Sequence, residues 1–111
     1  MTTETKIKKN IFEAIEKIKE KCKPEKIILF GSYSYGTFTR DSDIDILIIK
    51  NADKKNRIDR FVEIKRIIYN PKFKTPISPI VITKNELQRR LNMGDDFIKE
   101  ITSKGEVLYE R

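Results

Sequence analysis

Two short apolar runs, separated by a polar segment, constrain the fold of this chain more than any other feature. Lys26–Phe30 and Ile46–Ile49 are each short enough to form a buried strand. A Gly-Ser pair closes the first run, and an Asp-x-Asp triplet opens the second: Gly31-Ser32 and Asp43-x-Asp45. If the two strands are neighbours in a sheet, these two motifs converge at one edge of it.

The spacing of the two aspartates predicts that they act together. Side chains two residues apart on a strand share a face, so Asp43 and Asp45 point the same way while Ile44 and Ile46 point into the core. Two carboxylates about 4 Å apart repel by about 4 kcal/mol at an effective dielectric near 20. Either one carboxylate takes up a proton or a cation lies between them. Mg²⁺ suits such a site, because it binds one or two carboxylates together with water and phosphate oxygens.

The Gly-Ser pair predicts a phosphate-binding turn. Gly31 lets the backbone approach a ligand closely, and Ser32 is predicted to be the N-cap of a short helix that runs through Tyr35, whose free N–H groups favour anions. Such amides facing two carboxylates suit a nucleoside triphosphate bound with Mg²⁺. The alternative is structural: an ordinary Gly-Ser turn, beside aspartates that form a solvated strand end or cap turns.

The Gly-Ser pair, the ten residues after it and the Asp-x-Asp triplet resemble the signature of the DNA polymerase β-like nucleotidyltransferase superfamily. The short length and the run Ser42-Asp43-Ile44-Asp45-Ile46-Leu47-Ile48 are most similar to its minimal nucleotidyltransferase (MNT) branch, which includes MntA-type antitoxins. A less specific likeness extends to Ser78–Val81, Glu86-Leu87, Phe97–Ile101, Gly105 and Leu108-Tyr109. The resemblance covers most of the chain and implies the nucleotidyltransferase fold.

The resemblance also implies an activity and a set of site residues. The chain is expected to be an enzyme that binds Mg-NTP, with ATP as the expected triphosphate, and transfers a nucleoside monophosphate to a hydroxyl. Asp43 and Asp45 are the expected catalytic residues and ligands of Mg²⁺ or Mn²⁺, and the expected nucleotide-binding residues are Gly31, Ser32, Tyr33 and Gly36. Relatives are often paired with a helical HEPN protein in toxin–antitoxin systems, so a HEPN-type partner is expected.

Two departures from the family pattern bear on catalysis. Tyr35 stands where many relatives carry an arginine before the second glycine. The family also places a third carboxylate on a later strand, at a position that falls near Pro76 or Ser78, and no Asp or Glu occurs from Ile64 through Asn85. The alternative function is therefore an antitoxin-like module, weakened in catalysis, that binds a nucleotide or a partner.

Composition limits the remaining possibilities. A chain of 111 residues with no internal repeat or linker predicts one domain over 1–111. It has no histidine and one cysteine, so a metal would be held by oxygen. We expect a cytoplasmic protein without a membrane span or signal segment. The net charge of +7 allows a nucleic-acid-binding domain as a further alternative, but the basic residues are spread along the chain, which does not favour it.

Apolar periodicity predicts the remaining elements. Helices are expected over about Lys6–Lys21, from near Asn51–Asp53 to about Tyr69, over Lys84–Asn92, and after Gly94. A strand over Ile77–Ile82 contains Pro79 and should therefore lie at a sheet edge or bend there. Val107–Tyr109 either adds a short strand or packs on the core. The predicted fold class is α/β (α+β), a small mixed sheet with helices packed on it.

Overall fold

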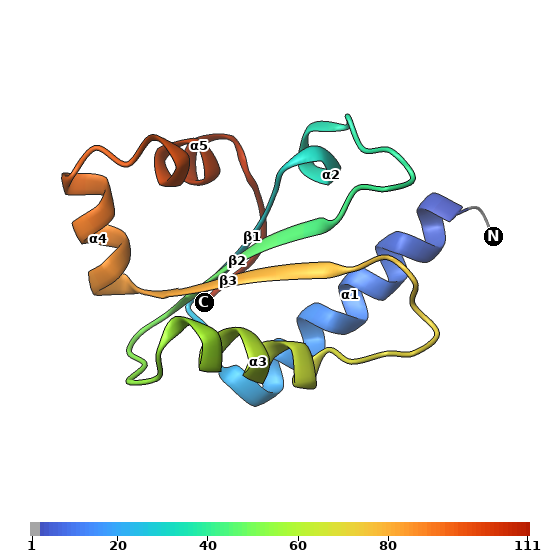
Figure 1. The fold of residues 1–111 in the computed structure, drawn as a ribbon, viewed down its shortest axis with the longest axis horizontal. Coiled ribbons are helices and arrows are strands. Elements are labelled where there is room, and N and C mark those ends of the chain that lie inside the picture. Colours follow the sequence, from blue (N-terminus) through green and yellow to red (C-terminus); the bar gives the residue numbers. More distant parts are fainter. Residues whose placement is uncertain (1–2) are drawn as a thin grey trace.

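Four strands form one mixed sheet at the centre of the computed structural model, which describes residues 3–111 (Figure 1). The strands are β1 (Lys26–Phe30), β2 (Ile44–Lys50), β3 (Ile77–Thr83) and β4 (Glu106–Glu110), in the spatial order β3-β2-β1-β4. β1 runs antiparallel to β2 and β4, whereas β2 and β3 are parallel. The predicted mixed sheet is confirmed, β3 lies at an edge as its proline predicts, and the C-terminal segment pairs as a strand.

Helices cover both faces of this sheet (Figure 1). One face packs on α1 (Thr3–Cys22) and α3 (Arg57–Ile67), and the other on α4 (Lys84–Asn92) and α5 (Asp96–Lys104). β2 shows why two cores form, because its side chains alternate between the faces. Ile44, Ile46 and Ile48 belong to the α1/α3 core, whereas Leu47 and Ile49 belong to the α4/α5 core. All five are buried, so β2 is the central strand on which both layers are built.

The start of α3 differs from the prediction. The helix begins at Arg57, and Asn56 is its N-cap, with the Asn56 side chain accepting a hydrogen bond from the Asp59 N–H. Asp53, the expected start, instead accepts a hydrogen bond from the Lys50 ammonium at 2.9 Å and another from the Lys55 N–H at 2.8 Å. Both Asp and Asn favour caps and turns, and the ion pair with Lys50 commits Asp53 to the turn.

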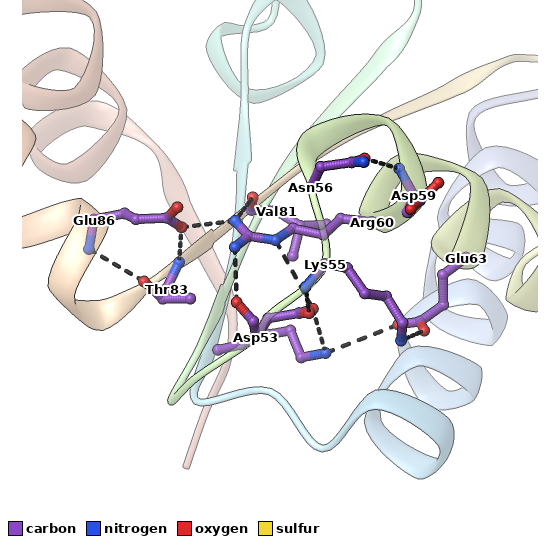
Figure 2. Close-up of polar contacts among 10 residues, drawn as sticks. Asp53, Lys55, Asn56, Asp59, Arg60, Glu63, Val81, Thr83 and Glu86 are labelled. Atoms are coloured by element: carbon purple, nitrogen blue, oxygen red, sulfur yellow. Dashed lines mark hydrogen bonds and ion pairs between the residues drawn. The ribbon is translucent and has the colours of Figure 1, made fainter.

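A buried arginine joins α3 to the edge of the sheet (Figure 2). The Arg60 guanidinium donates to Glu86 Oε1 at 2.7 Å, to the Val81 carbonyl at 3.3 Å and to the Asp53 carbonyl at 2.9 Å. Glu86 belongs to a capping box at the start of α4, in which it exchanges hydrogen bonds with Thr83. One side chain thus fixes the β2–α3 loop, β3 and α4 relative to one another.

None of the helices within residues 3–111 is both long enough and apolar enough to cross a membrane.

Candidate functional site

The antiparallel pairing of β1 and β2 brings the Gly-Ser and Asp-x-Asp motifs together. Phe30, the last residue of β1, pairs with Asp45 on β2, and Gly31 follows Phe30 directly. A Cβ atom built on Gly31 would lie 2.5 Å from Asp45 Oδ2. Only a residue without a side chain allows this carboxylate to lie so close to the backbone turn. The predicted convergence of the two motifs is therefore present in the structure.

The turn after β1 leads into α2 (Ser32–Tyr35), a single helical turn. Gly31 has φ 75° and ψ −159°, a conformation that glycine alone adopts readily. Its carbonyl accepts hydrogen bonds from the N–H groups of Ser34 and Tyr35, at 3.0 and 3.1 Å. The prediction that Ser32 is the N-cap is wrong: the N-cap is Gly31, which has no side chain to cap with, and Ser32 is the first helical residue.

The other two residues expected at this turn lie farther along it. Gly36 ends α2 in the left-handed conformation, and its N–H donates to the Ser32 carbonyl. A Cβ on Gly36 would meet no atom within 4 Å, so the need for glycine there is conformational. The Tyr33 ring stacks on Phe38 with the ring centroids 4.5 Å apart and also packs against the α1/α3 core. These contacts place Tyr33 and Gly36 in the turn itself, and the prediction that they bind a nucleotide stays a prediction, whereas Gly31 lies against Asp45.

The two aspartates differ in exposure and influence each other. Asp43 is exposed just before β2, whereas Asp45 is half-buried as the second residue of the strand. Burial raises the pKa of Asp45 above its usual range, and the negative charge of Asp43 raises it further. The surroundings of Asp45 thus disfavour its ionised form, and a cation bound between the two carboxylates would stabilise that form.

The raised pKa of Asp45 predicts how stability depends on pH without divalent metal. A carboxyl whose pKa is higher in the folded state binds its proton more tightly there, so the folded state loses stability as pH rises from about 3.8 through the folded pKa. In EDTA at pH 7, Asp45→Asn should therefore raise the melting temperature by a few degrees, and the gain should shrink toward pH 4. Thermal scans from pH 4 to 8 measure it.

Asp96→Asn is the matched control for these scans, because Asp96 is exposed and its charge favours the start of α5. It should leave the melting temperature unchanged or lower it slightly. A lower melting temperature of the Asp45→Asn variant at pH 7 would contradict the inference that the ionised Asp45 carboxylate destabilises the folded state.

The parallel register of β2 and β3 locates the position of the absent third carboxylate. Ser78 pairs with Asp45, so both side chains project from the same face of the sheet. The Pro76 carbonyl accepts a hydrogen bond from the Ile44 N–H at 2.9 Å, which anchors the approach to β3. Within the described part of the chain, no group of three or more Asp, Glu, Cys or His side chains lies close enough to share a metal ion. The available carboxylates are therefore a pair, with a serine beside them.

A cleft of about 710 Å³ adjoins this pair on the side of Asp43. Asp41, Asp43 and Pro76 line it, and so do two cations, Arg40 and Lys74. Its lining includes Asp43 but neither Asp45 nor Ser78, so the cleft lies beside the carboxylate pair and contacts it at Asp43 only. Sequence reasoning missed Arg40 and Lys74. Lys74 lies in the loop before β3 and lines the cleft with Asp43, and no local pattern in the sequence indicates this proximity.

The fold and the paired motifs define a class of protein, and comparison with known sequences agrees. Residues 11–108 match the family of nucleotidyltransferase domains, and the chain belongs to that family. It is a nucleotidyltransferase. The resemblance seen in the sequence is confirmed at this level.

Individual relatives support the family assignment, and one solved structure shares the fold. "Putative protein adenylyltransferase MJ0604" of Methanocaldococcus jannaschii is 34% identical over 103 residues, covering 91% of this chain and 96% of the relative. "Putative protein adenylyltransferase MJ1305" of the same organism is 33% identical over 103 residues, covering 89% of this chain and 69% of the relative. A crystal structure of a "putative nucleotidyltransferase" from Sulfolobus solfataricus shares the fold, with a TM-score of 0.64, 22% identity and coverage of 93% of this chain and 79% of the other.

Proposed function

We propose that the chain binds a nucleoside triphosphate with Mg²⁺ at the junction of β1 and β2 and transfers its nucleoside monophosphate to a hydroxyl group. The observation that carries this proposal is the contact between the Asp45 carboxylate and the glycine turn, where a Gly31 Cβ would lie 2.5 Å from Asp45 Oδ2. It sets a negatively charged, oxygen-donating group beside backbone amides, which are the two surfaces that a metal-bound triphosphate requires.

Each residue has a role in this proposal. Asp43 and Asp45 would hold Mg²⁺ or Mn²⁺, which neutralises triphosphate charge when bound. The Ser32 hydroxyl and the backbone N–H groups of Ser32 and Tyr33, which directly follow Gly31, would hold phosphate oxygens, whereas the next two N–H groups already donate to the Gly31 carbonyl. The acceptor oxygen bonds to the α-phosphorus as the bond from that phosphorus to the bridging oxygen breaks, pyrophosphate leaves, and the hydroxyl proton passes to water. The chain contributes mainly position and charge neutralisation.

The donor and the acceptor are inferred from the relatives. Because these relatives are named protein adenylyltransferases, we propose ATP as the donor and a protein hydroxyl as the acceptor. We propose a helical HEPN-type protein as the partner that carries this hydroxyl, with the reaction in the cytoplasm, where nucleoside triphosphates are held. The protein acceptor in the relatives' names is the reason that a partner is invoked.

The direct test incubates the purified chain with each labelled nucleoside triphosphate, Mg²⁺ or Mn²⁺, and the product of the neighbouring reading frame. Metal-dependent transfer of label from ATP to that protein is the expected result. The Asp43→Asn/Asp45→Asn double variant should be inactive. The control variant Asp96→Asn, which removes an exposed carboxylate at the start of α5, should be active. Nucleotide binding without transfer to any acceptor would instead favour a module weakened in catalysis.

The serine at the third position predicts a gain of activity on substitution. Two Mg²⁺ ions bring four positive charges, and two carboxylates offset only half of them, so a second ion beside the acceptor hydroxyl should bind weakly. Because Ser78 lies level with Asp45, Ser78→Asp should raise the transfer rate about tenfold, roughly 1.4 kcal/mol of barrier. Single-turnover assays with labelled ATP measure this.

Pro76→Asp is the companion variant, since the position of the third acid was predicted near either residue. Asp41→Asn tests the alternative that Asp41, which lines the cleft beside Asp43, already supplies the missing acid. Robust transfer by the unmodified chain that is insensitive to Asp41→Asn would show that a third acid is not needed.

A further inference from the structure

A second concave surface lies away from the glycine turn, along the open edge of the sheet. It is a groove of about 1410 Å³ between α3, β3 and the α4–α5 pair, and we refer to it as the β3 groove. Residues that define it are Arg57, Ile58, Phe61, Pro79, Met93 and Phe97. Four of them are large apolar side chains with much of their surface exposed: Ile58 (73%), Met93 (78%), Phe97 (50%) and Phe61 (43%). Such a concentration of exposed apolar surface indicates an interaction site.

The backbone edge of β3 offers no continuous row of free groups to an added strand. Alternate residues of β3 face away from β2, and the chain's own side chains already bind three of their backbone groups. The Ile77 carbonyl accepts from the Lys65 ammonium at 3.0 Å, and the Val81 carbonyl accepts from Arg60 at 3.3 Å (Figure 2). The Thr83 N–H donates to Glu86 at 2.7 Å, and Pro79, between Ile77 and Val81, has no N–H to offer.

This protected edge decides how an occupant can bind. A peptide that adds to a sheet needs a row of free backbone groups. In β3, side chains from α3 and α4 occupy three of these groups, and Pro79 lacks an N–H between them. The occupant must therefore insert side chains between the apolar residues of the groove. A helix with apolar residues at every third and fourth position is the element that binds an apolar groove in this way.

Charge indicates the chemistry of that helix. Arg57 and Arg89 line the β3 groove, both are exposed, and neither forms an ion pair within residues 3–111. The two acidic residues of the lining, Glu86 and Asp95, form ion pairs within the chain, with Arg60 at 2.7 Å and with Arg90 at 3.8 Å. Acidic side chains on the occupant would complement Arg57 and Arg89. A second copy of this chain, with a net charge of +7, would be repelled instead.

We propose that the β3 groove binds an acidic amphipathic helix of another protein. Apolar side chains of that helix lie between Ile58, Phe61 and Met93, and its carboxylates meet Arg57 and Arg89. The inference does not depend on nucleotide transfer, because neither Ser78 nor the pair of Asp43 and Asp45 lines the β3 groove.

A display library of helical hairpins with one randomised outer face tests this proposal. Hairpins selected on the full chain should carry Asp or Glu beside apolar residues three or four positions apart. Their affinity should fall about tenfold or more for Arg57→Glu/Arg89→Glu and for Ile58→Ser. Matched controls outside the groove are Lys17→Glu/Lys99→Glu for charge and Tyr69→Ser, which is 72% exposed, for apolar surface. These should change affinity less than about twofold.

Several outcomes would overturn the proposal. Failure to select any binder, selected faces that lack acidic residues, or equal losses in the control variants would each contradict it. Sedimentation of the unmodified chain tests whether a second copy of the chain occupies the groove instead. A dimer that the Ile58→Ser substitution dissociates would assign the groove to that second copy. The nucleotide assays are read separately, so that their failure leaves the result on this groove intact.

Discussion

Asp45→Asn is expected to reduce the rate of nucleotide transfer about 10²–10³-fold. The substitution keeps the size of the side chain but removes one of two negative metal ligands, and charge stabilisation by a bound metal is worth several kcal/mol in a transition state. Because the pKa of Asp45 is raised by burial and by Asp43, the same change should raise the melting temperature without metal. Activity and stability should therefore move in opposite directions, which loss of folding cannot produce.

Labelled-ATP transfer with saturating Mg²⁺ provides the measurement, with Asp96→Asn as the control of equal charge change. A variant that retains more than about a tenth of the unmodified rate would show that Asp45 is not a metal ligand of consequence. A variant that loses activity and melts at a lower temperature would instead point to a structural role for this carboxylate.

Gly31→Ala is expected to lower nucleotide affinity at least about tenfold. The new methyl group would lie 2.5 Å from Asp45 Oδ2, so the carboxylate must swing away from the turn. Gly31 also has φ 75° and ψ −159°, a region nearly closed to other residues, and strain of this kind costs about 1–3 kcal/mol. Displacement of Asp45 removes a metal ligand, whereas backbone strain lowers stability, so both binding and melting temperature should fall.

Gly94→Ala separates the two effects. Gly94 has φ 77°, and a Cβ there would meet no atom within 4 Å, so this variant carries backbone strain without displacing a carboxylate. It should lose stability by about 1–2 kcal/mol and keep its nucleotide affinity. Calorimetric titration with ATP and Mg²⁺, beside thermal unfolding of both variants, makes the comparison. Equal nucleotide affinities in the two variants would contradict the inferred contact between Gly31 and Asp45.

The parts of the fold that could be predicted are those that regular periodicity specifies. The alternation of Asp43 and Asp45 with buried isoleucines, and the apolar run before Gly31, were enough to predict that the two motifs converge. Pro79 predicts that β3 lies at an edge or bends there, because proline has no N–H for a ladder, and the structure places β3 at an edge. The absence of acidic residues between Ile64 and Asn85 predicted a neutral partner for Asp45, and the register supplies Ser78.

The remaining features depend on contacts between distant residues. The sequence predicts a start of α3 that is too early, because Asp53 and Asn56 both favour helix starts, and only the ion pair with Lys50 shows that Asp53 belongs to the turn. The Ser32 side chain suits an N-cap, but the strained backbone of Gly31 determines where α2 begins. The β3 groove combines α3 with the α4–α5 pair, and no local pattern connects these segments.

The most direct test of whether the two aspartates form a metal-dependent nucleotide site is calorimetric titration with ATP. The unmodified chain and the Asp43→Asn/Asp45→Asn double variant are each titrated once with Mg²⁺ and once with EDTA. We predict that Mg²⁺ strengthens ATP binding to the unmodified chain about tenfold or more, and that this gain is absent from the double variant, whose binding in EDTA is unchanged or slightly tighter. The same Mg²⁺-dependent affinity in both chains would contradict the account.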